Sequence, residues 1–228
     1  MTNNEAAQLR LMSLLFRAHP WHGVSAGDRS PEIVTVYVEI VPTDTIKYEL
    51  DKTTGLLKVD RPQRFSNTCP SYYGLIPQTF CGNRVGKMME RRTGRTGLVG
   101  DGDPLDICVF SEKTISHGNL LLRAVPIGGL SMIDNGKADD KIIAVMEEDA
   151  IYGGWTDIVQ ANAVIDRLKH YFSTYKGTRE VGREQSEVTG VYGRDEARAV
   201  IMASAEDYRA EYSGLRDLVD LAHAPKDE

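Results

Sequence analysis

Hydrophobic and polar positions alternate along the segment 33–62, as they do in half-buried β-strands. Residues 33–41 are rich in β-branched types and place every second side chain on one face. Residues 46–50 and 56–62 alternate again, and Thr53-Thr54-Gly55 predicts a hairpin turn between them. Short strands joined by tight turns predict a curled antiparallel sheet or a small barrel.

A longer hydrophobic period predicts helices near both ends of the chain. Residues 4–18 carry apolar side chains at three- and four-residue spacing, which predicts an amphipathic helix. Asp157 predicts the cap of a second helix that runs to about Tyr175, and a third helix is expected from about Asp195 to Tyr212. Further strands are expected at 72–77, directly after Asp106, at 119–127 and at 141–146. One helix, a block of strands and two helices predict a single α+β domain over residues 1–228.

Composition narrows the class of protein. The chain of 228 residues is 41% hydrophobic and 26% charged, as in ordinary soluble globular proteins, and no apolar run is long enough to cross a membrane. Its net charge of −6 argues against a general nucleic-acid or anionic-membrane binder. Cys69, Cys81 and Cys108 form no C-x-x-C pair and predict reduced thiols in a cytoplasmic protein, with neither a disulfide nor a zinc site.

Two further segments have ambiguous patterns. Residues 82–100 contain five glycines and five basic residues against one acidic residue, but neither a P-loop nor a G-x-G-x-x-G motif. This composition predicts an exposed hairpin or flexible loop beside the acidic cluster described below, and a substrate clamp is the alternative. His19 and His22 lie in a loop with Pro20 and Gly23, where a structural role is expected in preference to metal binding.

The densest concentration of charge is Asp101-Gly102-Asp103-Pro104-Leu105-Asp106. Carboxylates this close together raise the cost of ionising one another, so the cluster must be fully solvated or neutralised by cations. The apolar run 107–110 follows directly and predicts that the cluster lies at the mouth of a core strand. Hard divalent cations such as Mg2+ are the natural partners of such oxygen ligands, so a metal-dependent active site is expected.

A second acidic turn contains Asp134 and Asp139. Carboxylates alone would suggest a calcium site, whereas carboxylates together with basic and phenolic groups indicate that metal and side chains jointly hold a phosphate-rich anion. The basic and phenolic candidates lie at predicted strand or helix ends: Lys47, Arg61, Tyr73, Lys141, Tyr175 and Lys176.

At these residues the chain resembles the soluble family I inorganic pyrophosphatases, whose signature Asp-x-Asp-Pro-x-Asp is matched by residues 101–106. The other matching segments follow in the family's order: Ile46-Lys47-Tyr48-Glu49, Val59-Asp60-Arg61, Tyr73-Gly74, Asp134-x4-Asp139-x-Lys141 and Tyr175-Lys176. The resemblance covers roughly residues 33–180. It implies a five-stranded OB-like β-barrel flanked by α-helices. The implied reaction is Mg2+-dependent hydrolysis of pyrophosphate to two phosphates by direct attack of a metal-activated water, with several Mg2+ ions in the active site.

The resemblance also implies a role for each matched residue. Asp103 corresponds to the general base that takes the proton of the attacking water. Asp101, Asp106 and Asp139 correspond to ligands of the tighter metal, and Asp134 and Asp139 to ligands of metals that arrive with the substrate, with Glu39 and Glu49 nearby. The groups implied to hold the phosphate oxygens are Lys47, Arg61, Tyr73, Lys141, Tyr175 and Lys176.

The chain departs from the family pattern in three places. Residues 1–32 form an N-terminal extension, and residues 82–100 form a basic, glycine-rich inserted loop. Asn135 stands where many members carry an acid, which is expected to weaken one peripheral metal contact. A homo-oligomer is expected, but the two added segments leave the number of subunits open.

Two other functions compete with this interpretation. One is a phosphatase or nucleotide hydrolase acting on other phosphate compounds. The other is a calcium-binding module, because Glu112 lies twelfth from Asp101 as in an EF-hand loop. However, Leu105 and Asp106 occupy positions where that loop needs an oxygen ligand and a glycine, and a strand-like run follows.

Overall fold

The computed structural model describes residues 17–176 and 186–214. The helix predicted over 4–18 lies almost entirely outside the described residues. The remaining segments form a mixed sheet, a separate hairpin and helices packed around them.

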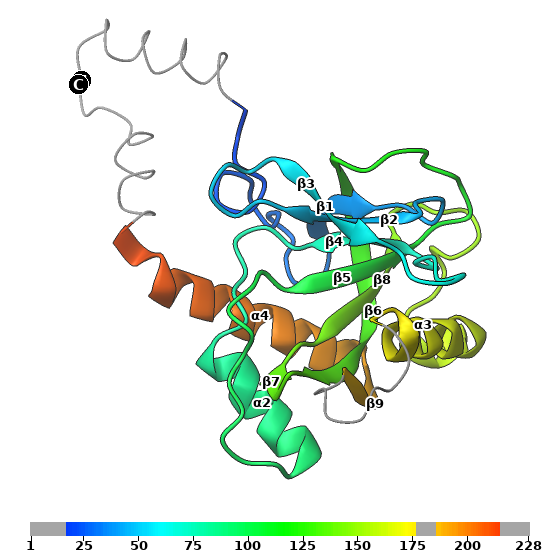
Figure 1. Ribbon diagram of the computed structural model, residues 1–228. Coiled ribbons are helices and arrows are strands. Elements are labelled where there is room, and N and C mark those ends of the chain that lie inside the picture. The colour runs from blue at the N-terminus through cyan, green and yellow to red at the C-terminus, as the bar shows by residue number, and fades with distance from the viewer. Residues whose placement is uncertain (1–16, 177–185, 215–228) are drawn as a thin grey trace, which may run out of the picture.

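Five strands close into a ring (Figure 1). They are β1 (Val34–Ile40), β4 (Tyr72–Leu75), β5 (Asp106–Phe110), β8 (Lys141–Met146) and β6 (Leu120–Asp134). Each pairs with the next in that order, and the start of β6 returns to pair with β1. The pair β5–β8 is parallel and the others are antiparallel. The five-stranded barrel predicted from the sequence is therefore confirmed.

The barrel strands are buried on both faces, which explains their continuous apolar runs. In β5, Ile107 and Val109 belong to one core cluster, whereas Cys108 and Phe110 belong to another. The first cluster also contains side chains of the C-terminal helix α4 (Arg194–Glu211), and the second contains side chains of α3 (Asn162–Thr174). The helices therefore cover different faces of the barrel strands, and each fully buried large apolar side chain contributes about 2 kcal/mol.

The predicted hairpin is also present. Strands β2 (Ile46–Leu50) and β3 (Leu57–Pro62) pair antiparallel as a separate two-stranded sheet. Its register places Lys47 opposite Arg61, which brings two basic side chains from distant positions together. In Figure 1 this hairpin lies above strands β4 and β5.

The two C-terminal helices agree with the sequence pattern, with one refinement. Asp157 does act as a cap, but it caps a short 3-10 helix, η1 (Ile158–Ala161), which leads into α3. Helix α4 begins at Arg194, next to the predicted Asp195. The preceding strand β9 (Glu187–Gly193) and the short strand β7 (Lys137–Ala138), both of which pair with β6, were not predicted.

The loop conformation predicted for residues 82–100 is wrong. Most of the segment forms helix α2 (Asn83–Thr93), which lies beside α4 (Figure 1). Val85 and Met89 are fully buried on one face of this helix. A Cβ at Gly86 would come within 2.5 Å of the Leu98 carbonyl oxygen, so this glycine allows close packing of α2 against the segment that follows it. The many glycines and charged residues of this segment favoured a loop in the prediction, although its few apolar residues lie on one face of a helix.

The structural role expected of His19 and His22 is supported by their contacts. The His22 ring stacks on the buried Trp21 at 4.4 Å between centroids, and its Nδ1 lies 2.8 Å from the Tyr208 hydroxyl. Burial and the neighbouring His19 lower the pKa of His22 to about 4. His22 therefore anchors the segment before β1 to helix α4, and His19, whose Nε2 lies 3.2 Å from the Lys52 carbonyl oxygen, connects the same segment to the β2–β3 hairpin.

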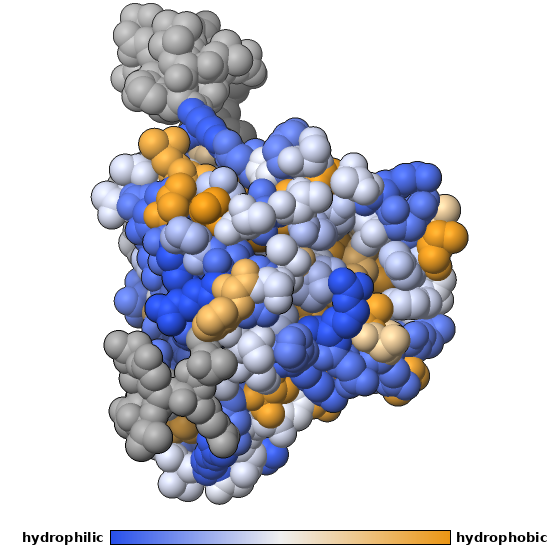
Figure 2. Space-filling view, turned by 45° about the vertical axis from the view of Figure 1, so that its right-hand side comes forward, coloured by the Kyte–Doolittle hydropathy of each residue, from blue (hydrophilic) through white to orange (hydrophobic). Residues whose placement is uncertain are grey.

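The environment of the cysteines and the polarity of the surface can be compared with the expectations from composition. Cys69, Cys81 and Cys108 are all buried free thiols. Within the described ranges, no helix is both long and apolar enough to cross a membrane. In the view of Figure 2 much of the surface is hydrophilic, and hydrophobic residues show only as separate small groups.

Candidate active site

All thirteen candidate residues named from the sequence line one cavity of about 260 Å³. They come from the β2–β3 hairpin, from strands β1, β4, β5, β6 and β8, from the loops before β5 and β8, and from the end of α3. Segments from residue 39 to residue 176 therefore meet at a single place. The acidic members are Glu39, Glu49, Asp101, Asp103, Asp106, Asp134 and Asp139, and the basic and phenolic members are Lys47, Arg61, Tyr73, Lys141, Tyr175 and Lys176.

The loop before β5 holds the first acidic cluster in a fixed shape. Gly102 has a φ of +85°, a left-handed conformation that glycine adopts without strain. The backbone N–H of Asp103 donates to the Asp101 carboxylate at 3.0 Å, and the Asp103 carbonyl accepts from the N–H of Cys81 at 2.8 Å. The carboxylates of the cluster are therefore presented to the cavity by a loop that is hydrogen-bonded to the segment between β4 and α2.

The parallel pairing of β5 with β8 sets Asp106 opposite Lys141. The Lys141 ammonium, with only 3% of its side chain exposed, contacts the carboxylates of both Asp106 and Asp139. Burial acts to lower the pKa of Lys141, but these two carboxylates raise it well above its ordinary value. Tyr73 on β4 donates its hydroxyl proton to Asp106 at 2.5 Å. A charged, hydrogen-bonded group thus forms the floor of the cavity.

Several of the carboxyl groups are held in surroundings that disfavour their charge. Burial, reinforced by Asp139, raises the pKa of Asp101 to about 8. Burial and the nearby Asp106 raise the pKa of Glu39 to about 8, although its carboxyl group accepts the Leu50 N–H at 2.6 Å. Burial also raises the pKa of Asp106. The cavity therefore concentrates more buried carboxylates than its own cations stabilise.

This donor set fits a divalent cation of the Mg2+ type. Such ions prefer carboxylate oxygens and keep several water ligands, and a bound dication would remove the repulsion that raises these pKa values. Among residues 17–176 and 186–214 no three carboxyl groups already form a closed metal cage. Instead the ammonium groups of Lys52, Lys141 and Lys176 contact Asp103, Asp139 and Asp134, respectively.

One wall of the cavity, formed by the β2–β3 hairpin, is basic. Asp60 accepts from Lys47 at 2.7 Å and from Arg61 at 2.5 Å, so one carboxylate orients both cations. The Arg61 guanidinium lies 5.5 Å from the centre of the Tyr175 ring. In the described part of the chain its Nη2 is buried without a hydrogen-bond partner. A planar donor with an unused, buried N–H is suited to bind an anionic oxygen.

The second acidic turn contributes Asp134 at the end of β6. Its carboxylate accepts from Lys176 at 2.5 Å and from the Ser186 hydroxyl at 2.6 Å. Burial opposes ionisation here, but these two donors lower the pKa of Asp134. The exposed Asn135 donates to the same carboxylate at 3.1 Å. Asp134 is therefore ionised and oriented, at the rim of the cavity and not at its floor.

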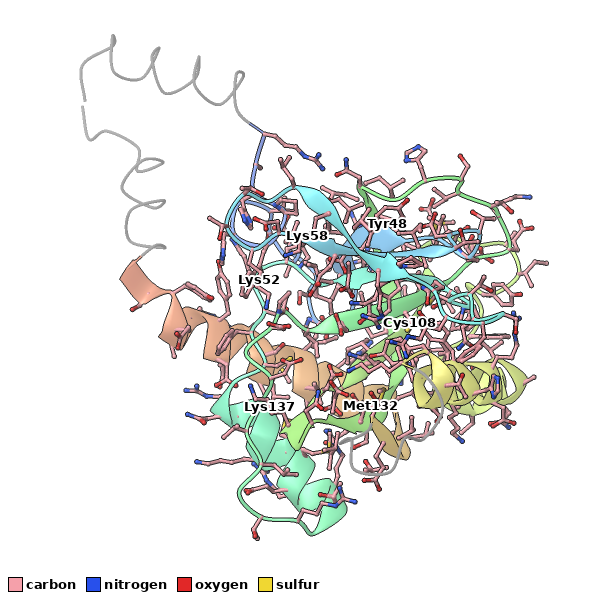
Figure 3. The ribbon with its side chains drawn as sticks, in the orientation of Figure 1. Tyr48, Lys52, Lys58, Cys108, Met132 and Lys137 are labelled. Atoms are coloured by element: carbon pink, nitrogen blue, oxygen red, sulfur yellow. The ribbon has the colours of Figure 1, made fainter. Side chains whose placement is uncertain are left out.

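Two polar side chains in the cavity were not assigned a role from the sequence. Asp60 lies within the matched segment Val59-Asp60-Arg61, and its position next to Arg61 could have identified it as a residue of the cavity. Lys52 follows β2, and its ammonium contacts Asp103, 51 positions away in the chain. Figure 3 labels Lys52 together with Tyr48 and Lys58 of the same hairpin. Tyr48, expected to face the core, packs against it but also lines the cavity.

Comparison with known proteins places this chain in a family. The family model described as inorganic pyrophosphatase matches residues 36–209. An inorganic pyrophosphatase of Chlamydia muridarum is 51% identical over 195 residues, covering 83% of this chain and 93% of the relative. Soluble inorganic pyrophosphatase 3 of Arabidopsis thaliana is 40% identical over 172 residues, covering 73% of this chain and 71% of the relative.

Solved structures show the same fold. The crystal structure of inorganic pyrophosphatase from Thermus thermophilus superposes with a TM-score of 0.71 at 27% identity, covering 85% of this chain and 99% of that one. The structure from Neisseria gonorrhoeae superposes with a TM-score of 0.66 at 27% identity, covering 82% and 96%. Because the family model covers most of the chain and relatives of up to 51% identity cover most of it as well, the chain belongs to the inorganic pyrophosphatase family.

Proposed function

We propose that this protein hydrolyses inorganic pyrophosphate to two phosphates with Mg2+ as its cofactor. The observation that carries the proposal is the cavity itself, which is lined by seven candidate carboxyl groups together with lysines, an arginine and tyrosines. Carboxylates suit a hard divalent cation, and the basic and phenolic donors suit phosphate oxygens. The family to which the chain belongs supports the same reaction.

The proposed metal ligands divide into two groups. Asp101, Asp106 and Asp139 lie on the loops and strand ends around the buried Lys141 and would hold the tighter ions. Asp134, Glu39 and Glu49 would complete the contacts of ions that enter with the substrate. Bound Mg2+ lowers the pKa of a coordinated water and offsets the negative charge of the phosphates.

The proposed general base is Asp103. Its carboxylate lies in the cavity on the rigid loop before β5, and it takes the proton of the attacking water. Lys52 contacts the same carboxylate and fixes its orientation. No covalent intermediate is required, because a water positioned in line with the scissile bond suffices for phosphoryl transfer.

The basic wall binds the substrate and stabilises the leaving phosphate. Lys47 and Arg61 are pre-oriented by Asp60, so they need little rearrangement to accept a phosphate. Lys141 and Lys176 supply positive charge at the floor and the rim. The hydroxyl groups of Tyr73 and Tyr175 add neutral donors. Charge that develops on the leaving group is thus met by donors already in place.

The two alternative functions receive less support. The relatives that this chain matches are inorganic pyrophosphatases, which favours pyrophosphate over a nucleotide as the substrate. The EF-hand alternative needs a helix after Glu112, whereas strand β5 ends at Phe110 and a bend follows.

A substrate panel tests the proposal. Phosphate release is measured from pyrophosphate, a nucleoside triphosphate and a sugar phosphate, each with and without Mg2+. Release from pyrophosphate that depends on Mg2+ and exceeds the other rates is expected. A higher rate on the nucleotide or the sugar phosphate would favour the phosphatase alternative.

We also propose that the protein acts in the cytoplasm as a homo-oligomer. Three buried free thiols suit a reducing compartment, and the resemblance to the family implies association of identical subunits. Light scattering of the purified protein measures the number of subunits directly, and a monomer across the micromolar range would contradict the second part.

A further inference from the structure

Helix α2 is built against the turn that carries Asp139 and Lys141. Met89 of α2 packs with Ile133 of β6 and Ala138 of β7 in a small buried cluster. The segment that follows α2 runs beside β7, where the Ala138 N–H donates to the Val99 carbonyl at 2.9 Å. Lys137, labelled in Figure 3 on β7, marks this junction between helix and turn. The helix and the turn therefore form one packed unit.

One ion pair connects helix α2 to the turn. The Arg92 guanidinium, in the last turn of α2, contacts the carboxylate of Asp140, whose side chain is 0% exposed. The same guanidinium donates to Glu196 of α4 at 3.1 Å and lies 4.6 Å from the centre of the Tyr192 ring of β9. Arg92 is thus tied to α4 and β9 as well as to the turn.

Asp140 lies between two residues of the candidate active site. Asp139 and Lys141 both line the cavity, whereas Asp140 does not. In extended chain, successive side chains point to opposite sides, so an anchor on Asp140 restrains its two neighbours from behind. The Asp139 N–H also donates to the Met132 carbonyl at 3.0 Å, which leaves the turn few ways to move.

We propose that Arg92 is a positioning residue. Its ion pair with Asp140 holds Asp139 and Lys141 where metal and phosphate bind. The inference rests on the proposed function for the roles of Asp139 and Lys141, but the contact itself does not. The Asp140 side chain is fully buried and contacts the Arg92 guanidinium, so loss of Arg92 removes the contact that ties the turn to α2 and leaves a buried polar group without this partner. We expect the turn to shift in response.

The decisive variant is the double substitution Arg92→Met with Asp140→Leu. It removes one positive and one negative charge, so the net charge near the metal ligands is unchanged. Buried ion pairs replaced by apolar residues of similar volume often keep their stability, so the melting temperature should stay close to that of wild type. Loss of the restraint should nevertheless weaken Mg2+ binding about tenfold, as loss of outer supporting contacts does at other metal sites.

Mg2+ binding is measured by isothermal titration calorimetry on the metal-free protein, with Mg2+ as the probe and no substrate present. In the presence of pyrophosphate, the Mg2+ concentration giving half-maximal rate should rise by a similar factor. A double variant with wild-type melting temperature and wild-type Mg2+ affinity would overturn the proposal. Because the calorimetry needs no turnover, failure of the wild type to hydrolyse pyrophosphate would refute the proposed function while leaving this comparison intact.

Two further variants keep the test decisive. Arg92→Lys retains a cation for Asp140 and should bind Mg2+ within about threefold of wild type. If Arg92→Lys lost as much Mg2+ affinity as the double variant, the ion pair with Asp140 would not be the contact that supports Mg2+ binding. Arg95→Met is the matched control. Arg95 lies just beyond α2 and donates to the exposed Glu187 of β9 at 2.9 Å, and not to Asp140, so its loss should leave Mg2+ affinity unchanged.

Discussion

The ammonium of Lys52 contacts the carboxylate of Asp103, joining the β2–β3 hairpin to the acidic loop before β5. Burial acts to lower the pKa of Lys52, but the Asp103 carboxylate raises it. The hairpin turn that presents Lys52 is itself fixed, because the Asp51 carboxylate accepts the Thr54 N–H at 2.9 Å. The proposed general base is therefore oriented by a residue that no motif identified.

Replacing Lys52 by methionine should lower kcat/KM for pyrophosphate by about tenfold, because Asp103 loses the partner that orients it. Steady-state phosphate release provides the measurement. Lys58→Met is the control, since Lys58 lies on the same hairpin but pairs with Asp51 at 3.5 Å, outside the cavity. Equal effects of the two substitutions would argue against an orienting role for Lys52.

Replacing Lys141 by methionine should destabilise the metal-free protein by about 3–5 kcal/mol, because it leaves the carboxylates of Asp106 and Asp139 without their shared cation. Urea denaturation measures the free energy of unfolding. Mg2+ should restore part of the loss by supplying positive charge to the same carboxylates. The control is Lys137→Met on the exposed side of β7. A loss below about 1 kcal/mol for Lys141→Met would show that the buried contact does not stabilise the fold.

Mg2+ binding should release protons at pH 7. Asp101 and Glu39 have pKa values of about 8, above the unfolded values of about 4, so both are largely protonated in the metal-free protein at neutral pH. Between pH 4 and 8 the folded chain holds protons at these groups that the unfolded chain has released, so their contribution to the free energy of unfolding falls as the pH rises. Metal binding must displace those protons.

Calorimetry in buffers of different ionisation enthalpy counts the protons released. Release is expected at pH 7 and should become small at pH 9, and Glu39→Gln should reduce the number at pH 7. If the wild type released no protons at pH 7, the raised pKa values of these carboxyl groups would be contradicted.

Local patterns predicted most of the barrel strands, and the resemblance to a family predicted which residues lie together in the cavity. Strand β1 and the β2–β3 hairpin follow from alternation, and β5 follows from the apolar run after Asp106. The cavity residues were grouped because motifs such as residues 101–106 appear in a family's order, and the barrel brings all of them together.

Long-range packing decided what local patterns missed. Gly86 weakens a helix by propensity, yet it allows α2 to pack against Leu98 and Val99, so the helix is stabilised by tertiary contacts that composition does not reveal. Strand β9 includes Gly190 and forms only because β6 offers an edge for pairing. The contacts of Lys52 with Asp103 and of Arg92 with Asp140 join residues 51 and 48 positions apart, and no spacing rule predicts them.

The role of Asp103 as general base is tested by comparing Mg2+-dependent phosphate release from pyrophosphate in wild type and in Asp103→Asn. The substitution keeps the shape of the side chain but removes its ability to take the proton of water, so kcat should fall by about 100-fold or more. Melting temperature should stay the same, and Asp166→Asn on the exposed face of α3 should retain full activity. Near-wild-type turnover by Asp103→Asn would show that Asp103 is not the general base.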